Sequence, residues 1–214
     1  MTLEVAAPGV GFEAEYNVRL LHPDRAAFHE RGKALSRETY EGLQCRRDLR
    51  YGPGPSAELD FFPPAVPGST PLRPLVAFFH GGYWQAHERS EYAFVAKAFA
   101  GHGIATAIVG YDLAPRMRMA QIVAQARQAC TWLAAHAADL EFDAPALFAA
   151  GHSAGAHLAA CAFTAPHAPV AGALLVSGIF DLEPLVTTTL NRALGLTRAT
   201  AARWSPMHHA MPGG

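Results

Sequence analysis

The chain has 214 residues, which is long enough for one domain with a sizeable hydrophobic core and short for two. Its 17 Lys and Arg residues nearly balance its 18 Asp and Glu residues, so the formal charge of -1 gives no electrostatic reason to expect a nucleic acid or an anionic membrane as partner. The three cysteines are far apart in the sequence and favour neither a disulfide framework nor a zinc site; they are Cys45, Cys130 and Cys161.

The N-terminal part of the chain predicts no targeting or membrane segment. Its first residues, MTLEVAAPGVGFEAEYN, lack a basic region followed by an apolar stretch, and no later segment reaches about 18 consecutive apolar residues. We therefore expect a soluble, cytoplasmic protein. Residues 16–44 are the most charged part of the chain and show weak helical periodicity, which predicts a surface helix or a lid over the core that follows.

Two short strands are predicted next. The stretches CRRDLRYG and AELDFF are joined by the turn-forming run PGPSA, a pattern typical of a hairpin or meander. The Pro-rich run PPAVPGSTPLRP then ends this section.

From residue 75 onward, apolar runs alternate with helical segments. The runs are LVAFFHGG, IATAIVGY, ALFAAG and VAGALLVSG. Between them lie EYAFVAKAFAGHG, residues 117–138 with apolar side chains at spacings of three and four, and SAGAHLAACAFTA. Continuous apolar strands that alternate with helices are typical of a parallel sheet covered on both faces. The predicted fold class is α/β, in one domain that spans residues 1–214.

The segment GHSAG has the form of a nucleophile elbow, because Ser153 lies between two glycines, after an apolar strand and before a helix. At such a strained strand-to-helix turn the Ser153 hydroxyl would stand free at the carboxyl end of the sheet. The alternative is that Ser153 only caps the helix. The strand-turn-helix context favours the nucleophile.

The segment HGGYW follows the first apolar strand and is a candidate oxyanion loop. Backbone N–H groups must approach a developing oxyanion closely, and glycines permit that approach. We expect the N–H groups of Gly82, Tyr83 and Ala154 to be the donors, and His80 to orient the loop. Tyr83, Trp84 and the N-terminal segment are candidate walls of the substrate pocket, with core packing as the alternative for Trp84.

Six segments in this order resemble the α/β-hydrolase superfamily, and within it the kynurenine formamidase-like (arylformamidase) esterases. They are YGPGPSAELDFFP, HGGYW, YDLAP, GHSAGAHLAA, SGIFDLEPL and LNRALGL. The resemblance implies an α/β-hydrolase fold and a serine hydrolase that removes a formyl or acyl group from an arylamine or an ester, without a cofactor. N-formylkynurenine is the substrate that gives the group its name.

The acid and the histidine of a triad follow the nucleophile on later strands in this fold. After VAGALLVSG the sequence shows only short helical or loop pieces, so we expect both groups and the last strands to be absent, as in a C-terminally truncated chain. The acidic candidates are Asp181 and Glu183, and for Asp181 a turn or cap role is favoured. The oxyanion hole alone would leave the chain nearly inactive.

No histidine after the nucleophile is predicted to reach it. His157 would point along the elbow helix, His167 lies at the opposite end of the sheet, and His208 and His209 lie in a tail expected to be mobile. For the others, a solvated or packing role is expected; they are His22, His29, His87, His102, His136 and the elbow residue His152. No histidine pair has metal-ligand spacing, so no metal is predicted.

Two hypotheses follow. The chain is either a serine hydrolase acting on a small ester or formamide, or a non-catalytic α/β-hydrolase-like domain that binds ligands or partners. The last strand would leave an unpaired edge, which makes a homodimer or aggregation possible.

Overall fold

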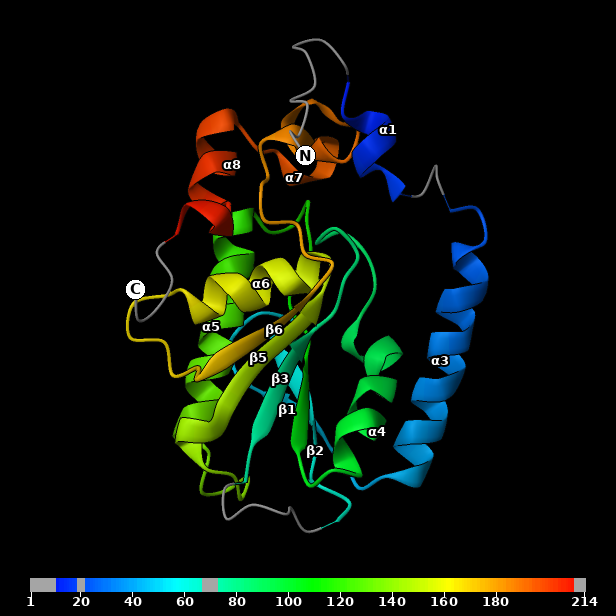
Figure 1. Ribbon diagram of the computed structural model, residues 1–214, viewed down its shortest axis with the longest axis vertical. Coiled ribbons are helices and arrows are strands. Elements are labelled where there is room, and N and C mark those ends of the chain that lie inside the picture. Colours follow the sequence, from blue (N-terminus) through cyan, green and yellow to red (C-terminus); the bar gives the residue numbers. More distant parts are fainter. Residues whose placement is uncertain (1–10, 19–21, 67–72, 210–214) are drawn as a thin grey trace, which may run out of the picture.

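The computed structural model describes residues 11–18, 22–66 and 73–209, and a six-stranded sheet lies at its centre (Figure 1). The strand order is β1-β2-β4-β3-β5-β6. The bounds are β1 Arg46–Arg50, β2 Glu58–Phe62, β3 Leu75–Phe79, β4 Ala105–Val109, β5 Leu147–His152 and β6 Gly172–Val176. The sheet is parallel from β4 to β6, whereas β1 and β2 form the predicted antiparallel hairpin. The predicted α/β class is confirmed.

Helices cover the sheet on both faces. On one face lie α5 (Met119–Ala135) and α6 (Ala154–Phe163), and on the other α3 (Arg25–Gly42) and α4 (Phe94–Ala100) (Figure 1). Strands β3 and β4 are buried at every position, as their uninterrupted apolar sequences require when both faces are covered. Two hydrophobic cores result, one on each side of the sheet.

Shorter elements gather at one end of the sheet. They are α1 (Glu13–Tyr16), η3 (Pro184–Thr187), α7 (Asn191–Leu194) and α8 (Arg198–Trp204) (Figure 1), and η4 (Pro206–His208) follows them and contacts α6. A 3-10 turn, η1 (Arg89–Tyr92), precedes α4, and another, η2 (Ala144–Ala146), precedes β5. The short elements after β6 agree with the expectation of short helical pieces.

In the charged N-terminal region, the described residues include the short helix α1 and the longer helix α3. The surface helix expected within residues 16–44 is α3, which packs beside α4 and η1. Residues 19–21 of this region lie outside the described residues, as do residues 67–72 of the Pro-rich run and the chain after residue 209.

One part of the sheet is uncovered on the face of α3 and α4. Phe148 on β5 is 38% exposed, and Leu174 and Val176 on β6 are 56% and 48% exposed. The register pairs Ala150 with Leu174 and His152 with Val176, so these side chains share one face. We call Phe148, Leu174 and Val176 the apolar strip. In the described chain, β6 is also an edge strand.

Candidate active site

Ser153 sits at a sharp turn between β5 and α6. Its backbone has φ 56° and ψ −120°, a conformation that non-glycine residues rarely adopt. Its N–H donates to the carbonyl of Val176 at 2.9 Å, and its carbonyl accepts from the N–H of His157 at 3.2 Å. The Ser153 side chain makes no capping hydrogen bond to α6, so the alternative role as a helix cap is wrong.

Two glycines make this turn possible. A Cβ on Gly155 would overlap the carbonyl oxygen of Phe79, because the start of α6 lies directly against the end of β3. A Cβ on Gly151 would overlap the backbone of Gly155 across the turn. The small residues on either side of Ser153 are therefore required by backbone packing.

The loop after β3 approaches the elbow closely. A Cβ on Gly81 would lie 3.1 Å from the carbonyl oxygen of His152 and 3.4 Å from the Ser153 Cβ. Gly82 has φ 116°, and its carbonyl accepts the N–H groups of Gln85 and Ala86. The loop thus runs beside the nucleophile, which is the placement an oxyanion loop requires.

His80 fixes the start of this loop. Its Nδ1 lies 2.7 Å from the carbonyl oxygen of Gly81, and its ring stacks on Tyr111 with 4.4 Å between centroids. The Tyr111 hydroxyl donates to the carbonyl of His80 at 2.7 Å. Burial lowers the pKa of His80 to about 4, so the ring is neutral near pH 7 and can donate from Nδ1.

Ser153 opens into a pocket of about 420 Å³. On the sheet side its described walls are Tyr83, His152, Ser153, Ser177 and Ile179, and on the N-terminal side they are Glu15, Tyr16, Val18 and His22. Tyr83 and the N-terminal segment thus line the pocket as expected. The Tyr83 hydroxyl donates to the carbonyl of Tyr16, which ties the two sides together. Ala154, the third expected oxyanion donor, is the first residue of α6, where N–H groups lack intrahelical acceptors.

Trp84 is not a wall of this pocket, and that prediction is wrong. Its side chain is fully buried in the hydrophobic core and packs edge-on against His157, with 4.9 Å between ring centroids. The positive φ of Tyr83 and Trp84 turns the loop inward at this point. The alternative of core packing is the observed one.

Two histidines of the pocket wall, His152 and His22, are not predicted by the sequence pattern. A solvated or packing role is the expectation for His152, and the structure shows it exposed and beside Ser153 in the pocket wall. His22, for which a solvated or packing role is expected, lines the same pocket. Because His152 directly precedes Ser153 in the sequence, its place in the pocket wall could have been predicted. No local sequence pattern predicts that His22 lies near Ser153.

Among the described residues, no later acidic or histidine side chain makes a hydrogen bond with the Ser153 side chain. Asp181 accepts the N–H of Glu183 at 2.9 Å, as expected of a turn carboxylate. His157 is buried, its Nε2 lies 2.8 Å from the carbonyl oxygen of Trp204, and burial lowers its pKa to about 4. His167 lies before β6, at the opposite end of the parallel sheet.

The two histidines of the C-terminal tail lie in the described part of the chain and make contacts there, while the mobility of the tail stays a prediction. His208 ends η4, and the imidazole of His209 lies 3.4 Å from the Thr164 hydroxyl and 3.1 Å from the carbonyl oxygen of Arg203. Thr164 caps the far end of α6, whose ten residues span about 15 Å. This contact holds His209 far from the nucleophile.

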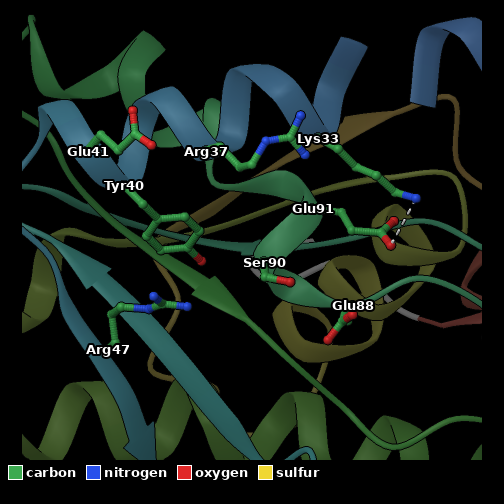
Figure 2. Close-up of a pocket in the computed structure, with 8 residues that line it drawn as sticks. All are labelled: Lys33, Arg37, Tyr40, Glu41, Arg47, Glu88, Ser90 and Glu91. Carbon is green, nitrogen blue, oxygen red and sulfur yellow. Dashed lines mark ion pairs between the residues drawn. The ribbon is translucent and has the colours of Figure 1, made fainter. Parts of the chain in front are cut away.

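A larger pocket of about 670 Å³ lies elsewhere, between α3, β1 and η1 (Figure 2). The guanidinium of Arg47 lies 4.3 Å from the centroid of the Tyr40 ring, and the Lys33 ammonium lies 3.8 Å from a Glu91 carboxylate oxygen. Its described lining holds three cationic and three acidic side chains, so it has no overall preference for either sign of charge. It contains none of the elbow residues.

Across the residues that the structure describes, no group of three or more His, Cys, Asp or Glu side chains is placed to hold a metal ion. No helix in those ranges is both long enough and apolar enough to cross a membrane.

The BD-FAE family model matches residues 59–170, which contain both the oxyanion loop and the elbow. The chain belongs to the BD-FAE family. This family member is 36% identical over 169 residues to a kynurenine formamidase of Danio rerio, across 76% of the chain and 56% of that protein. The chain thus spans little more than half the length of that relative.

Solved structures agree with this assignment. A protein described as a thioesterase, from Silicibacter sp., has a TM-score of 0.82 and 30% identity over 94% of this BD-FAE chain and 76% of its own. A Thermogutta terrifontis esterase with propionate bound has a TM-score of 0.62 and 27% identity over 78% of this chain and 67% of its own. The fold is that of the α/β-hydrolase esterases and arylformamidases.

Proposed function

We propose that this chain is a serine hydrolase that cleaves a formamide or a carboxylic ester through an acyl-enzyme on Ser153. The observation that carries the proposal is the strained, uncapped Ser153 in a pocket beside a glycine loop. The kynurenine formamidase and esterase relatives support this reaction class. The proposal includes a small-molecule substrate and a cytoplasmic location.

In this mechanism, the Ser153 oxygen attacks the formyl or acyl carbonyl while a base removes its proton. The N–H groups of Gly82, Tyr83 and Ala154 hold the oxyanion, and each essential donor is worth about 3–4 kcal/mol. The proton then goes to the departing amine or alcohol, and water repeats the sequence on the acyl-enzyme. By analogy with the formamidase relative, N-formylkynurenine, an intermediate of tryptophan catabolism, is the first substrate to test.

We expect slow turnover from the 214-residue chain, because the described residues after Ser153 bring no acid and histidine pair to it. An oxyanion hole and binding without a triad leave about 10³- to 10⁴-fold acceleration over water. The same observation favours the second candidate function, a non-catalytic ligand-binding domain.

A fluorophosphonate probe tests the proposal directly. We expect label to accumulate slowly on Ser153, up to one equivalent and located by mass spectrometry, because no histidine among the described residues activates the hydroxyl, and none on the Ser153→Ala variant. Release of formate from N-formylkynurenine and of p-nitrophenol from p-nitrophenyl acetate then ranks the substrates. A chain that is folded by circular dichroism but takes no label and hydrolyses neither substrate is the binding domain, not the hydrolase.

A further inference from the structure

His157 joins the turn at the nucleophile to two other segments of the fold. It lies in the first half of α6, and its N–H donates to the carbonyl of Ser153 at 3.2 Å. Its imidazole is fully buried, packs edge-on against the indole of Trp84, and places Nε2 2.8 Å from the carbonyl oxygen of Trp204. Trp84 directly follows Tyr83, an expected oxyanion donor, and Trp204 ends α8. One side chain therefore contacts both the oxyanion loop and helix α8.

The hydrogen bond to Trp204 fixes the tautomer of the His157 ring. A carbonyl oxygen only accepts, so Nε2 carries the hydrogen. Because burial lowers the pKa of His157 to about 4, Nδ1 keeps its lone pair near pH 7. The carbonyl belongs to the last residue of α8, where carbonyl groups lack intrahelical partners. The ring is thus held in one orientation, with Nε2 as a donor and Nδ1 as an acceptor.

The contact of His157 with Trp84 is more than apolar packing. Trp84 Nε1 and His157 Nδ1 are both buried, and neither has a hydrogen-bond partner among the residues that the structure describes. The ring centroids lie 4.9 Å apart at an interplanar angle of 84°. Since the indole N–H is a donor and Nδ1 an acceptor, the two rings bring complementary polar groups to the junction between the loop and α6.

The two segments that meet at this junction carry the expected oxyanion donors. Tyr83 directly precedes Trp84 in the loop, and Ala154 begins the helix that contains His157. Backbone contact also joins these segments, because a Cβ on Gly155 would overlap carbonyl oxygens at the end of β3 and the start of the loop. The loop and α6 are therefore held together by the backbone at Gly155 and by side chains at His157.

We propose that His157 is a positioning residue of the oxyanion hole, whose ring sets the spacing between the N–H groups of Tyr83 and Ala154. This inference rests on the proposed hydrolysis at Ser153, because the oxyanion forms there. His157 touches no reacting atom and acts through Trp84 and through α6. A misplacement of about 1 Å in such a site can cost about 10²-fold in rate, so the spacing matters to the reaction.

Two substitutions of His157 separate positioning from packing. His157→Gln keeps a donor for the Trp204 carbonyl and an acceptor for the Trp84 N–H, whereas His157→Leu fills a similar space with neither. The readout is the rate of Ser153 labelling by a fluorophosphonate. Without a triad, the acceleration that remains comes from the oxyanion hole and binding, so this rate reports the hole. We expect the limiting rate to fall about tenfold in His157→Leu and at most about twofold in His157→Gln, with the half-saturating probe concentration unchanged.

Leu133→Ala is the control for lost stability. Leu133 is fully buried in the same hydrophobic core, but it lies near the end of α5 that follows the contact side of α6 and approaches η2, before the start of β5. Ser153 follows the opposite end of β5. This variant should label at the wild-type rate at a temperature where urea denaturation shows every variant to be folded. Equal rates for the two His157 variants, an equal loss in Leu133→Ala, or a loss confined to the half-saturating concentration overturns the proposal.

NMR distinguishes a failure of this inference from a failure of the hydrolase. Both His157 variants lack the ring current of the imidazole, so a difference between their Tyr83 and Ala154 amide resonances reports the polar groups of the new side chain. We expect these resonances to differ between His157→Leu and His157→Gln. If the wild-type chain takes no label, the hydrolase is refuted. The difference in resonances then leaves the positioning role standing, and identical resonances overturn it.

Discussion

The reactivity proposed for Ser153 depends on neighbours that have no side chain. The positive φ of Ser153 is tolerated because Gly151 and Gly155 let β5, α6 and β3 meet at backbone distance. At this scale the pattern GHSAG predicted both the turn and its cause, since the steric requirement is local and the glycines are visible in the sequence.

Gly155→Ala tests this packing. The added methyl group would meet the carbonyl oxygens of Phe79 and His80, which cannot move aside as a flexible side chain would. We expect the free energy of unfolding to fall by about 3 kcal/mol, in spite of the better helix propensity of alanine. Urea denaturation measures the change, and Ser153 labelling should slow in parallel.

Gly42→Ala is the control for that variant. Gly42 is also helical, but an added Cβ would meet nothing within 4 Å. Its stability should stay the same or rise by about 0.4–1 kcal/mol. If Gly155→Ala and Gly42→Ala change the free energy of unfolding equally, close backbone packing at Gly155 does not stabilise the turn at Ser153.

Other residues could not be placed from the sequence. Tyr83 and Trp84 are adjacent and both aromatic, yet Tyr83 lines the pocket and Trp84 is buried, because the backbone turns between them. Glu15 and His22 line the Ser153 pocket because the tertiary fold brings the N-terminal segment to it. Periodicity carries no information about contacts of this kind.

Among the elements, the alternation of apolar runs and helices predicted β3 to β6 and the helices between them. Each apolar run is long and bounded by glycine or polar residues, so the local sequence alone predicts a strand that is buried on both faces. The exposed face of β6 was not visible in the same way. The run VAGALLVSG reads as a covered strand, but Leu174 and Val176 are about half exposed because no described helix packs over them.

The apolar strip and the free edge of β6 should make the 214-residue chain self-associate. An unpaired edge offers backbone hydrogen bonds, and the exposed Leu174 and Val176 add apolar contact area. Sedimentation velocity at about 100 µM should show dimers or larger species, and Leu174→Glu should shift the chain to monomer.

Met207→Glu serves as the comparison, because Met207 is 60% exposed and lies outside β6. It adds the same charge and should leave the association unchanged. A monodisperse wild-type monomer at this concentration would contradict the prediction, and equal effects of the two variants would attribute the association to net charge instead.

For the molecule as a whole, two buried histidines link stability to pH. Burial lowers the pKa values of His80 and His157 from about 6.5 to about 4, so the folded chain keeps both rings neutral where the unfolded chain takes up protons. Stability is therefore complete above about pH 6.5 and is lost as the pH falls toward 4. Each histidine contributes about 3 kcal/mol over that range.

The measurement is the free energy of unfolding in urea between pH 7 and pH 4.5. His157→Gln keeps an amide donor near the carbonyl of Trp204 but cannot titrate, so its stability should fall with a shallower slope than that of the wild type. A wild-type stability that is flat between pH 7 and pH 5 would show that neither ring resists protonation in the folded state.

The hydrogen bond from the N–H of Ser153 to the carbonyl of Val176 joins the turn at the nucleophile to the end of β6, so exchange of this amide reports on the pairing of β6 with β5. It is the last hydrogen bond along the pairing of β5 with β6, the edge strand of the described sheet. Local unfolding of this end of β6 therefore breaks it. Deuterium uptake at the Ser153 amide therefore measures how often β6 separates from β5 at this end. A further strand paired with β6 would slow the uptake. The same residue therefore carries the proposed nucleophile and the amide whose exchange rate measures local unfolding of β6.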